Sequence, residues 1–329
     1  MDYKNFSHHC LFGGDGFNYF RTATFFRENK NYKDAAPAGG YYVSGGDVEI
    51  YVQEAGPKNG VPIVFIHGFG AWSETWRKTL NALSAEGFHS YALDLSPFGF
   101  SEKIAKGDFS TASQAKRIIA VLNNLKLKEV ILVGHSVGSR PTVEVALTNP
   151  DRIKALVLTD AALGFSANKE EIKFEQNHPA WWLKTFFAIR PLRNAVLATT
   201  MTNPLTSKKL LGSFVADQEV LTKQLLSVYQ KPFIVKDSTN RLGDWLKVMS
   251  IDSDNTAGSD FNNFSKLNMP TLLVWGDKDT ITPLWQGEKL EKLIPHAALS
   301  VISGLGHIPQ IENPDEFNKV LLTFLQNNK

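Results

Sequence analysis

The sequence predicts an α/β fold in which a mostly parallel, doubly wound sheet of about eight strands carries helices on both faces. Two observations predict it. From residue 41 onward, short apolar runs alternate with stretches of helix length, and most of the runs end at Gly, Asp or Pro. The later runs are apolar at consecutive positions, as expected for strands that are covered on both sides.

The predicted strands differ along the chain. The first two, Tyr41–Val43 and Val48–Val52, flank Gly45-Gly46 and are interpreted as a hairpin. The other strands are expected at Val61–Ile66, His89–Leu95, Val130–Val133, Ile153–Leu158, Thr271–Trp275 and Leu299–Ile302. Helices are expected at Glu74–Glu86, Ser110–Asn124, Val137–Asn149, Leu284–Ile294 and Pro314–Gln326.

This rhythm stops between residues 162 and 265, where helical periodicity is punctuated by prolines. The interval is far longer than a loop between a helix and a strand. It therefore predicts a helical subdomain at 163–265, inserted into a core made of residues 41–162 and 266–329. Residues 1–40 are rich in Gly, Asn and aromatic residues and are expected to pack on the body as an irregular arm.

Composition limits the possible functions. A net charge of +2 with 21% charged residues is too balanced to indicate a nucleic-acid partner. The one cysteine, Cys10, cannot form an intrachain disulfide, and His8-His9-Cys10 is interpreted as part of a chain end, so no metal is expected. No apolar run reaches the roughly 18 residues of a membrane span. Without a visible signal peptide we expect a cytoplasmic protein, although a chain whose leader had been removed would look the same.

The central motif is Gly134-His135-Ser136-Val137-Gly138, a Gly-x-Ser-x-Gly pattern. Alone it is weak, because it arises by chance in on the order of one chain in ten of this length. Here it follows a predicted buried strand and opens a helical stretch. A serine on such a sharp turn projects its Oγ above the sheet. Ser136 is therefore the candidate nucleophile, the alternative being an ordinary Gly/Ser loop. Pro141 predicts a local irregularity in the helix that follows.

A serine hydroxyl needs a base, and the base needs a carboxylate that orients it. His307 is the candidate base, since it lies in a glycine-flanked loop after the last predicted strand. The loop after the preceding strand offers Asp277 and Asp279, and Asp160 follows an earlier strand. Asp279 is preferred because it lies further into its loop, whereas Asp277 suits a turn cap. Asp160 remains an alternative.

Together these pieces resemble the α/β-hydrolase superfamily over residues 41–329. The segment after Asp94 departs from the family pattern at Leu95-Ser96-Pro97-Phe98-Gly99, which bears on loop shape and not on Ser136, Asp279 and His307. The matching pieces, in family order, are His67-Gly68-Phe69-Gly70, Asp94 with Gly99-Phe100-Ser101, Gly134 to Gly138, Gly276-x-x-Asp279-x-x-x-Pro283, and Gly306-His307.

The resemblance implies two further features. The backbone N–H groups of Phe69 and Val137 would form the oxyanion hole, and residues 163–265 would form a helical cap over the site. Aromatic residues of that cap either line an acyl or aromatic pocket or form the cap's own core; the candidates are Trp181, Trp182, Phe186 and Trp245. No cofactor and no metal is implied.

The expected function is that of a serine hydrolase that cleaves carboxylic esters of small to medium, apolar substrates through an acyl-enzyme. A serine nucleophile argues against the haloalkane dehalogenases and epoxide hydrolases of the superfamily, which use aspartate. Three alternatives remain: a carbon–carbon bond hydrolase of vinylogous diketones, a cofactor-free perhydrolase, and a hydrolase-like receptor that binds a small ligand with little turnover. The sequence indicates neither the acyl-chain length nor the oligomeric state.

Overall fold

The computed structural model describes residues 22–24, 26–165, 181–251 and 255–328. The His8-His9-Cys10 tract lies outside these ranges, as do residues 166–180 of the expected helical insertion.

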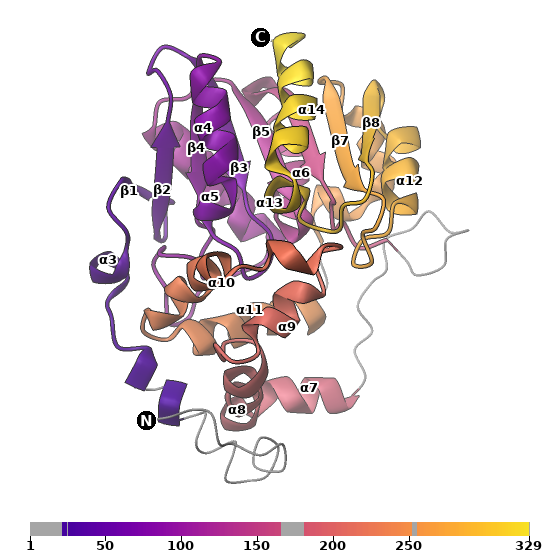
Figure 1. The fold of residues 1–329 in the computed structure, drawn as a ribbon. Helices are drawn as coiled ribbons and strands as arrows, with labels where there is room; N and C mark the ends of the chain where they lie inside the picture. Colours follow the sequence, from indigo (N-terminus) through magenta and orange to yellow (C-terminus); the bar gives the residue numbers. More distant parts are fainter. Residues whose placement is uncertain (1–21, 25, 166–180, 252–254, 329) are drawn as a thin grey trace.

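One eight-stranded sheet runs through the molecule, in the order β1-β2-β4-β3-β5-β6-β7-β8 (Figure 1). β1 pairs with β2, and β2 with β4, in antiparallel fashion, whereas every other neighbouring pair is parallel. This sheet confirms the predicted fold class. The strands are β1 Gly40–Ser44, β2 Glu49–Ala55, β3 Val61–Ile66, β4 Phe88–Leu93, β5 Val130–His135, β6 Ile153–Thr159, β7 Thr271–Gly276 and β8 Ala297–Ile302.

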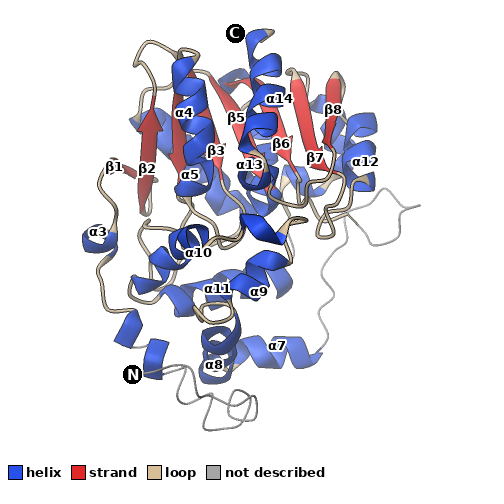
Figure 2. Cartoon of the chain, in the orientation of Figure 1, coloured by secondary structure: helices blue, strands red, loops and turns tan. Residues whose placement is uncertain are grey.

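Helices cover both faces of the sheet (Figure 2). Successive strand residues point to opposite faces, so in β3 Ile63 and Phe65 pack under one helical layer, while Val64 and Ile66 pack under the other. Consecutive apolar residues are therefore needed in the central strands. The first layer holds α4 Arg77–Ala85 and α14 Pro314–Gln326; the second holds α5 Thr111–Asn124, α6 Ser139–Thr148 and α12 Trp285–Leu293.

Between β6 and β7 the described chain is helical. These elements, called the helical segment below, lie together beyond one end of the sheet (Figure 1). They are α7 Trp181–Ala188, α8 Arg190–Thr200, α9 Ser207–Gly212, α10 Lys223–Gln230 and α11 Ser238–Ile251, with short 3-10 turns between some of them.

The described part of the N-terminal arm links this helical segment to the sheet. Glu28 is buried and accepts hydrogen bonds from the backbone N–H (3.1 Å) and the hydroxyl of Thr239 in α11. A few residues later, in the one-turn helix α3 (Tyr32–Ala35), the Tyr32 hydroxyl donates to Glu49 at the start of β2 (2.6 Å). The arm thus contacts both parts of the molecule through side-chain hydrogen bonds.

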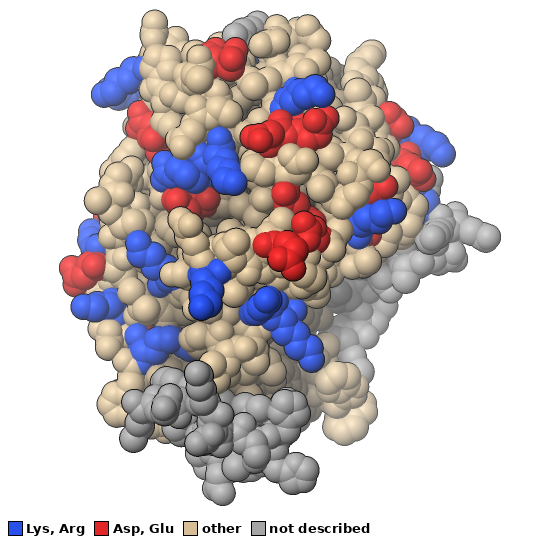
Figure 3. Space-filling model, in the orientation of Figure 1, with Lys and Arg blue, Asp and Glu red and all other residues tan. Residues whose placement is uncertain are grey.

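The surface carries charges of both signs. On the face shown in Figure 3, acidic and basic side chains are interspersed over the sheet and its helices, and basic ones predominate over the helical segment. None of the helices that the structure describes is both long and apolar enough for a bilayer crossing.

Trp76 tests the packing of the first helical layer. Its fully buried ring lies 5.0 Å from the ring of Phe65 and 6.1 Å from that of Phe317. We expect Trp76→Ala to lower the free energy of unfolding by about 3–5 kcal/mol, because it removes apolar contacts and leaves a cavity. Trp182→Ala, at a side chain that is 58% exposed, is the matched control, with an expected loss within about 0.5 kcal/mol. Urea unfolding measures both, and equal losses would contradict the packing described here.

Candidate active site

Ser136 lies on a sharp turn between β5 and α6. β5 ends at His135, Ser136 has a φ of +52°, and a 3-10 turn over Ser136–Gly138 leads into α6. A positive φ is unfavourable for a residue with a side chain. It is held here because β5 is hydrogen-bonded on both sides, to β3 and to β6, up to the turn.

The two glycines of the motif allow the backbone segments to approach closely. A Cβ on Gly138 would lie 2.3 Å from the carbonyl oxygen of His67, and one on Gly134 would lie 2.6 Å from the Thr142 hydroxyl. Both distances are far below van der Waals contact, so only glycine fits. Pro141 is the third residue of α6, where a backbone N–H has no partner within the helix. The irregularity expected at Pro141 is therefore absent from α6, which runs unbroken from Ser139 to Thr148 after a 3-10 turn over Ser136–Gly138.

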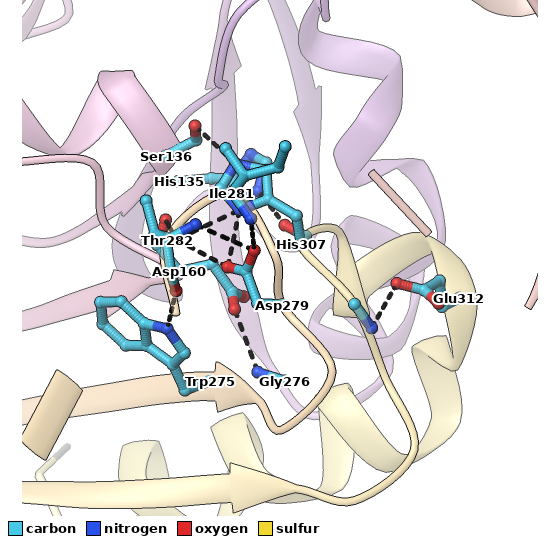
Figure 4. A network of polar contacts seen from close by, with 11 residues as sticks. His135, Ser136, Asp160, Trp275, Gly276, Asp279, Ile281, Thr282, His307 and Glu312 are labelled. Carbon is cyan, nitrogen blue, oxygen red and sulfur yellow. Dashed lines mark hydrogen bonds and ion pairs between the residues drawn. The ribbon is translucent and has the colours of Figure 1, made fainter. Parts of the chain in front are cut away.

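The structure brings the three predicted residues together. The His307 ring lies between the other two side chains, with Nε2 2.8 Å from Ser136 Oγ and Nδ1 2.8 Å from Asp279 Oδ2 (Figure 4). A carboxylate only accepts hydrogen bonds, so Nδ1 carries the proton and Nε2 accepts from the serine hydroxyl. All three residues are buried. They follow β5, β7 and β8, whose carboxyl ends meet at one edge because these strands are parallel.

Asp279 is held by three hydrogen bonds from its own loop. The N–H groups of Ile281 (2.7 Å) and Thr282 (3.0 Å) donate to Oδ1, and the Thr282 hydroxyl donates to Oδ2 (2.6 Å). Burial by itself would raise the pKa of Asp279, but the hydrogen bond and charge of His307 and the bonds from Thr282 hold it below the usual value. Thr282 has no role in the sequence interpretation; only the structure shows that its hydroxyl bonds to Asp279.

The two other acids have separate partners. Asp277 accepts hydrogen bonds from the backbone N–H of Gly304 (2.6 Å) and the hydroxyl of Ser303 (3.3 Å), and thus caps a turn. Asp160 is fully buried, and its Oδ1 accepts from the N–H of Gly276 (3.0 Å). Its carboxyl group nevertheless lies beside Asp279 (Figure 4).

Two more histidines lie near Ser136. Burial lowers the pKa of His67 to about 4 and that of His135 to about 3, the latter also through the charge of His307. Both are therefore neutral at physiological pH. His135 Nε2 donates to the carbonyl of His307 (2.7 Å), and His67 Nε2 accepts the N–H of Leu95 (3.0 Å). They hold the surrounding loops, whereas His307 alone of the three contacts the serine hydroxyl.

The backbone of the His67–Gly70 loop lies directly beside the serine. A Cβ on Gly68 would lie 2.9 Å from Ser136 Cβ. Phe69 follows Gly68, and Val137 follows Ser136, so the two residues expected to supply N–H donors flank the same side chain. The buried Asp94 shapes the adjoining loop by accepting the N–H groups of Ser73 (2.6 Å) and Phe100 (2.7 Å).

Two cavities adjoin these loops. The first is open to solvent, with about 520 Å³ of empty space that includes part of that solvent, and none of its lining residues is charged; its lining includes Phe69, Leu211, Phe214, Tyr229, Phe233 and Leu242. The second, also open, has about 360 Å³ of empty space on the same measure, and its lining includes Gly68, Phe98, Val137, Arg140, Trp245 and Met249. Phe69 of the first cavity and Trp245 of the second are in contact, with ring centroids 5.4 Å apart and ring planes tilted by 30°.

Of the four aromatic residues expected to line a pocket, only Trp245 lines one of these two cavities. Trp245 is buried and lines the second cavity. Trp181 and Trp182 are 78% and 58% exposed on α7, and neither they nor the partly buried Phe186 lines either cavity. The expectation for these three residues is corrected: α7 packs through Phe187, which is buried, and turns both tryptophans outward.

Asp160, Asp279 and His307 also place three potential metal ligands within 4.8 Å of one another. However, both nitrogens of His307 already take part in hydrogen bonds. A metal at this position would have to replace the contact with Asp279 or with Ser136, so the donor set fits hydrogen bonding better than metal binding.

Thr282→Val tests the hydrogen bond from the Thr282 hydroxyl to the carboxylate of Asp279. Removing a hydrogen bond to an ionised group is expected to lower the free energy of unfolding by about 1.5–3 kcal/mol at pH 7. Because the pKa of Asp279 is lower in the folded state, its ionisation stabilises the fold at pH values above about 4, the pKa of an unfolded Asp. This stabilisation is lost as the pH falls through the pKa of Asp279 in the folded state. The deficit of Thr282→Val should therefore shrink below about pH 4. Thr282→Ser, which keeps the hydroxyl, is the control; urea unfolding at several pH values measures the deficit, and a pH-independent deficit would contradict this account.

A family model described as alpha/beta hydrolase fold matches residues 61–314. A 2-hydroxy-6-oxononadienedioate/2-hydroxy-6-oxononatrienedioate hydrolase of Pseudomonas putida is 26% identical over 284 residues, which cover 85% of this chain and 92% of that protein.

Solved structures with the same fold include a meta-cleavage product hydrolase of Pseudomonas fluorescens IP01, with a TM-score of 0.71 and 23% identity, covering 88% of this chain and 98% of that one. A membrane phospholipase A, described as a bacterial virulence factor, has a TM-score of 0.70 and 21% identity, covering 94% and 91%. Structures with such similar folds thus bear names that refer to different reactions, so the likeness supports the fold and leaves the substrate open.

Proposed function

The chain belongs to the α/β-hydrolase fold family, and on that premise we propose that it is a serine hydrolase that cleaves carboxylic esters through an acyl-enzyme. The observation that carries the proposal is the hydrogen-bonded chain from Ser136 through His307 to Asp279, with 2.8 Å at each step. This is the arrangement that turns a serine hydroxyl into a nucleophile.

In the proposed reaction, Ser136 Oγ attacks the ester carbonyl carbon while His307 Nε2 takes its proton. The imidazolium then returns this proton to the leaving alcohol, and a water molecule, activated by the same nitrogen, hydrolyses the acyl-enzyme. Asp279 stays ionised and stabilises the imidazolium. The backbone N–H groups of Phe69 and Val137 would hold the negative charge on the carbonyl oxygen, a contribution on the order of a few kcal/mol for each donor.

We propose that residues 163–265 act as a cap that provides the substrate pocket. The first cavity supports an apolar acyl group, because its lining carries no charged side chain. Phe214 connects this cavity to the site: its carbonyl accepts the N–H of His307 (2.7 Å), and its ring lies 5.7 Å from the imidazole. Trp245 would contact the other side of the substrate, from the second cavity.

Carbon–carbon bond hydrolysis is the second candidate. The curated relative from Pseudomonas putida is named for a dioate substrate. In this chain the second cavity, which adjoins Val137, has Arg140 as the one basic residue in its lining besides the neutral His67. A guanidinium there would suit a carboxylate on the substrate.

Hydrolysis of p-nitrophenyl esters, from acetate to long acyl chains, tests the proposal. We expect turnover with an optimum at a chain length that fills the first cavity. Ser136→Ala should lower kcat/KM on the order of 10⁴-fold or more, because the nucleophile is lost. Asp279→Asn should lower kcat/KM by up to about 10⁴-fold, since the carboxylate that accepts from His307 Nδ1 is lost. Asp277→Asn, in the same loop, is the matched control and should change activity little.

A vinylogous diketone acid is the second substrate to assay. Turnover of the diketone without turnover of any ester would replace the ester-hydrolase proposal by the second candidate. Ester hydrolysis that survives in Ser136→Ala would overturn both. Tight binding of small ligands without turnover of either substrate would indicate a receptor.

A further inference from the structure

Asp160 is a buried acid for which the proposed reaction has no use. It follows β6 directly, with a φ of +43°, and none of its surface is exposed. Oδ1 accepts the N–H of Gly276, whereas Oδ2 is enclosed with no hydrogen-bond partner among the described residues. A carboxyl oxygen without a partner in the interior is costly if the group is ionised, so this position needs an explanation.

The carboxyl group of Asp160 faces the proposed catalytic residues. Polar side-chain atoms of Asp160, Asp279 and His307 all lie within 4.8 Å of one another (Figure 4). The other titratable groups around them are Glu312 from the segment after β8, and the neutral His135 from β5. No Lys or Arg of the described chain forms an ion pair with Asp160. Two ionised carboxylates would therefore repel each other here, and among the described residues the groups that offset negative charge, His307 and Thr282, bond their side chains to Asp279.

The repulsion is removed when one of the two carboxylates binds a proton, and Asp160 binds this proton more tightly than Asp279 does. Burial, and next the charge of Asp279, raise the pKa of Asp160 well above its usual value. The pKa of Asp279 is lowered, because the hydrogen bonds from His307 and Thr282 outweigh its own burial. At neutral pH the pair is thus one neutral acid, Asp160, and one carboxylate, Asp279.

We propose that Asp160 is a reserve acid for His307, meaning a buried carboxyl group that can replace the negative charge of Asp279. It is neutral while Asp279 is ionised. When the charge of Asp279 is lost, Asp160 becomes the carboxylate that stabilises the imidazolium of His307. This inference rests on the proposed function of Ser136, His307 and Asp279. In Asp279→Asn the repulsion from Asp279 is gone, so Asp160 gives up its proton to solvent at a lower pH than in the wild type, although its burial still raises its pKa. Where Asp160 is ionised, the single negative charge of the pair is restored on it. In the wild type Asp160 is neutral and takes no part in the proposed reaction.

A double-mutant cycle with Asp160→Asn and Asp279→Asn tests this role, with kcat/KM for the best ester as the readout. Asp160→Asn alone replaces one neutral group by another of the same shape, and should change kcat/KM by less than about threefold. In the Asp279→Asn background the same replacement removes the last carboxylate, and should cost at least about tenfold more activity. An equal cost in both backgrounds would mean that Asp160 is only structural, and would overturn the proposal.

The pH profile gives an independent readout. If Asp160 is neutral in the wild type, Asp160→Asn leaves the acidic side of the pH profile of kcat/KM unchanged. If Asp160 is ionised, the loss of its negative charge shifts that side of the profile to lower pH by about one pH unit. The residual activity of Asp279→Asn should rise with pH as Asp160 ionises, and this rise should vanish in the double variant. A shift of the acidic side in the single variant, or a rise that persists in the double variant, overturns the proposal. If Asp160→Asn does not fold, Asp160→Ser takes its place in every comparison.

Unfolding measurements separate this proposal from the proposed function. An acid whose pKa is raised on folding makes the fold lose stability as pH rises from its unfolded value, about 4, toward its folded value. The unfolding constant of the wild type, divided by that of Asp160→Asn, should therefore rise tenfold per pH unit above about pH 4. If this ratio of unfolding constants does not change with pH, Asp160 is not neutral in the folded protein and the inference about it is wrong, whether or not esters are substrates. Ester turnover that survives in Ser136→Ala would contradict only the proposed function.

Discussion

The strained backbone turn at Ser136 determines how the loops at the carboxyl ends of the central strands pack. A side chain at positive φ is stable only when its surroundings fix the backbone, and here β3 and β6 hold β5 on both sides up to that residue. The same turn brings the carbonyl of His67 so close to Gly138 that no side chain fits. The loop after β3 is thereby placed beside the serine. The positions of Phe69 and Val137 relative to Ser136 follow from this packing.

The fold and the three residues of the candidate site could be predicted because both leave strong local signals. Buried central strands require apolar residues at consecutive positions, and β3 to β7 supply them. Parallel strands place their carboxyl ends together, so residues distant in sequence, such as Ser136 and His307, could be expected to meet. The choice of Asp279 over Asp277 depended on position within one loop, and hydrogen bonds now distinguish the two acids.

Features that depend on how helices pack could not be predicted in the same way. Trp181, Trp182, Phe186 and Phe187 span nearly two turns of α7 and point in several directions around it, so their sequence does not say which side faces the molecule. Only the contacts with α8 and α11 decide this. Thr282 was missed for a different reason: its hydroxyl matters through its distance to Asp279, which three residues of loop leave undetermined. The neighbouring carboxyl of Asp160 likewise depends on the register of β6 against β7.

The contacts of the N-terminal arm have a mechanical consequence for the helical segment. That segment is joined to the core covalently at two points, after β6 and before β7. The arm also ties the segment to the core, because Glu28 is bonded to α11 while Tyr32 is bonded to the start of β2. Further hydrogen bonds join the segment to the core directly, such as the one from the His307 N–H to the Phe214 carbonyl. A hinge movement of the helical segment away from the sheet therefore has to break these direct contacts, and the arm has to detach as well or move with the helices.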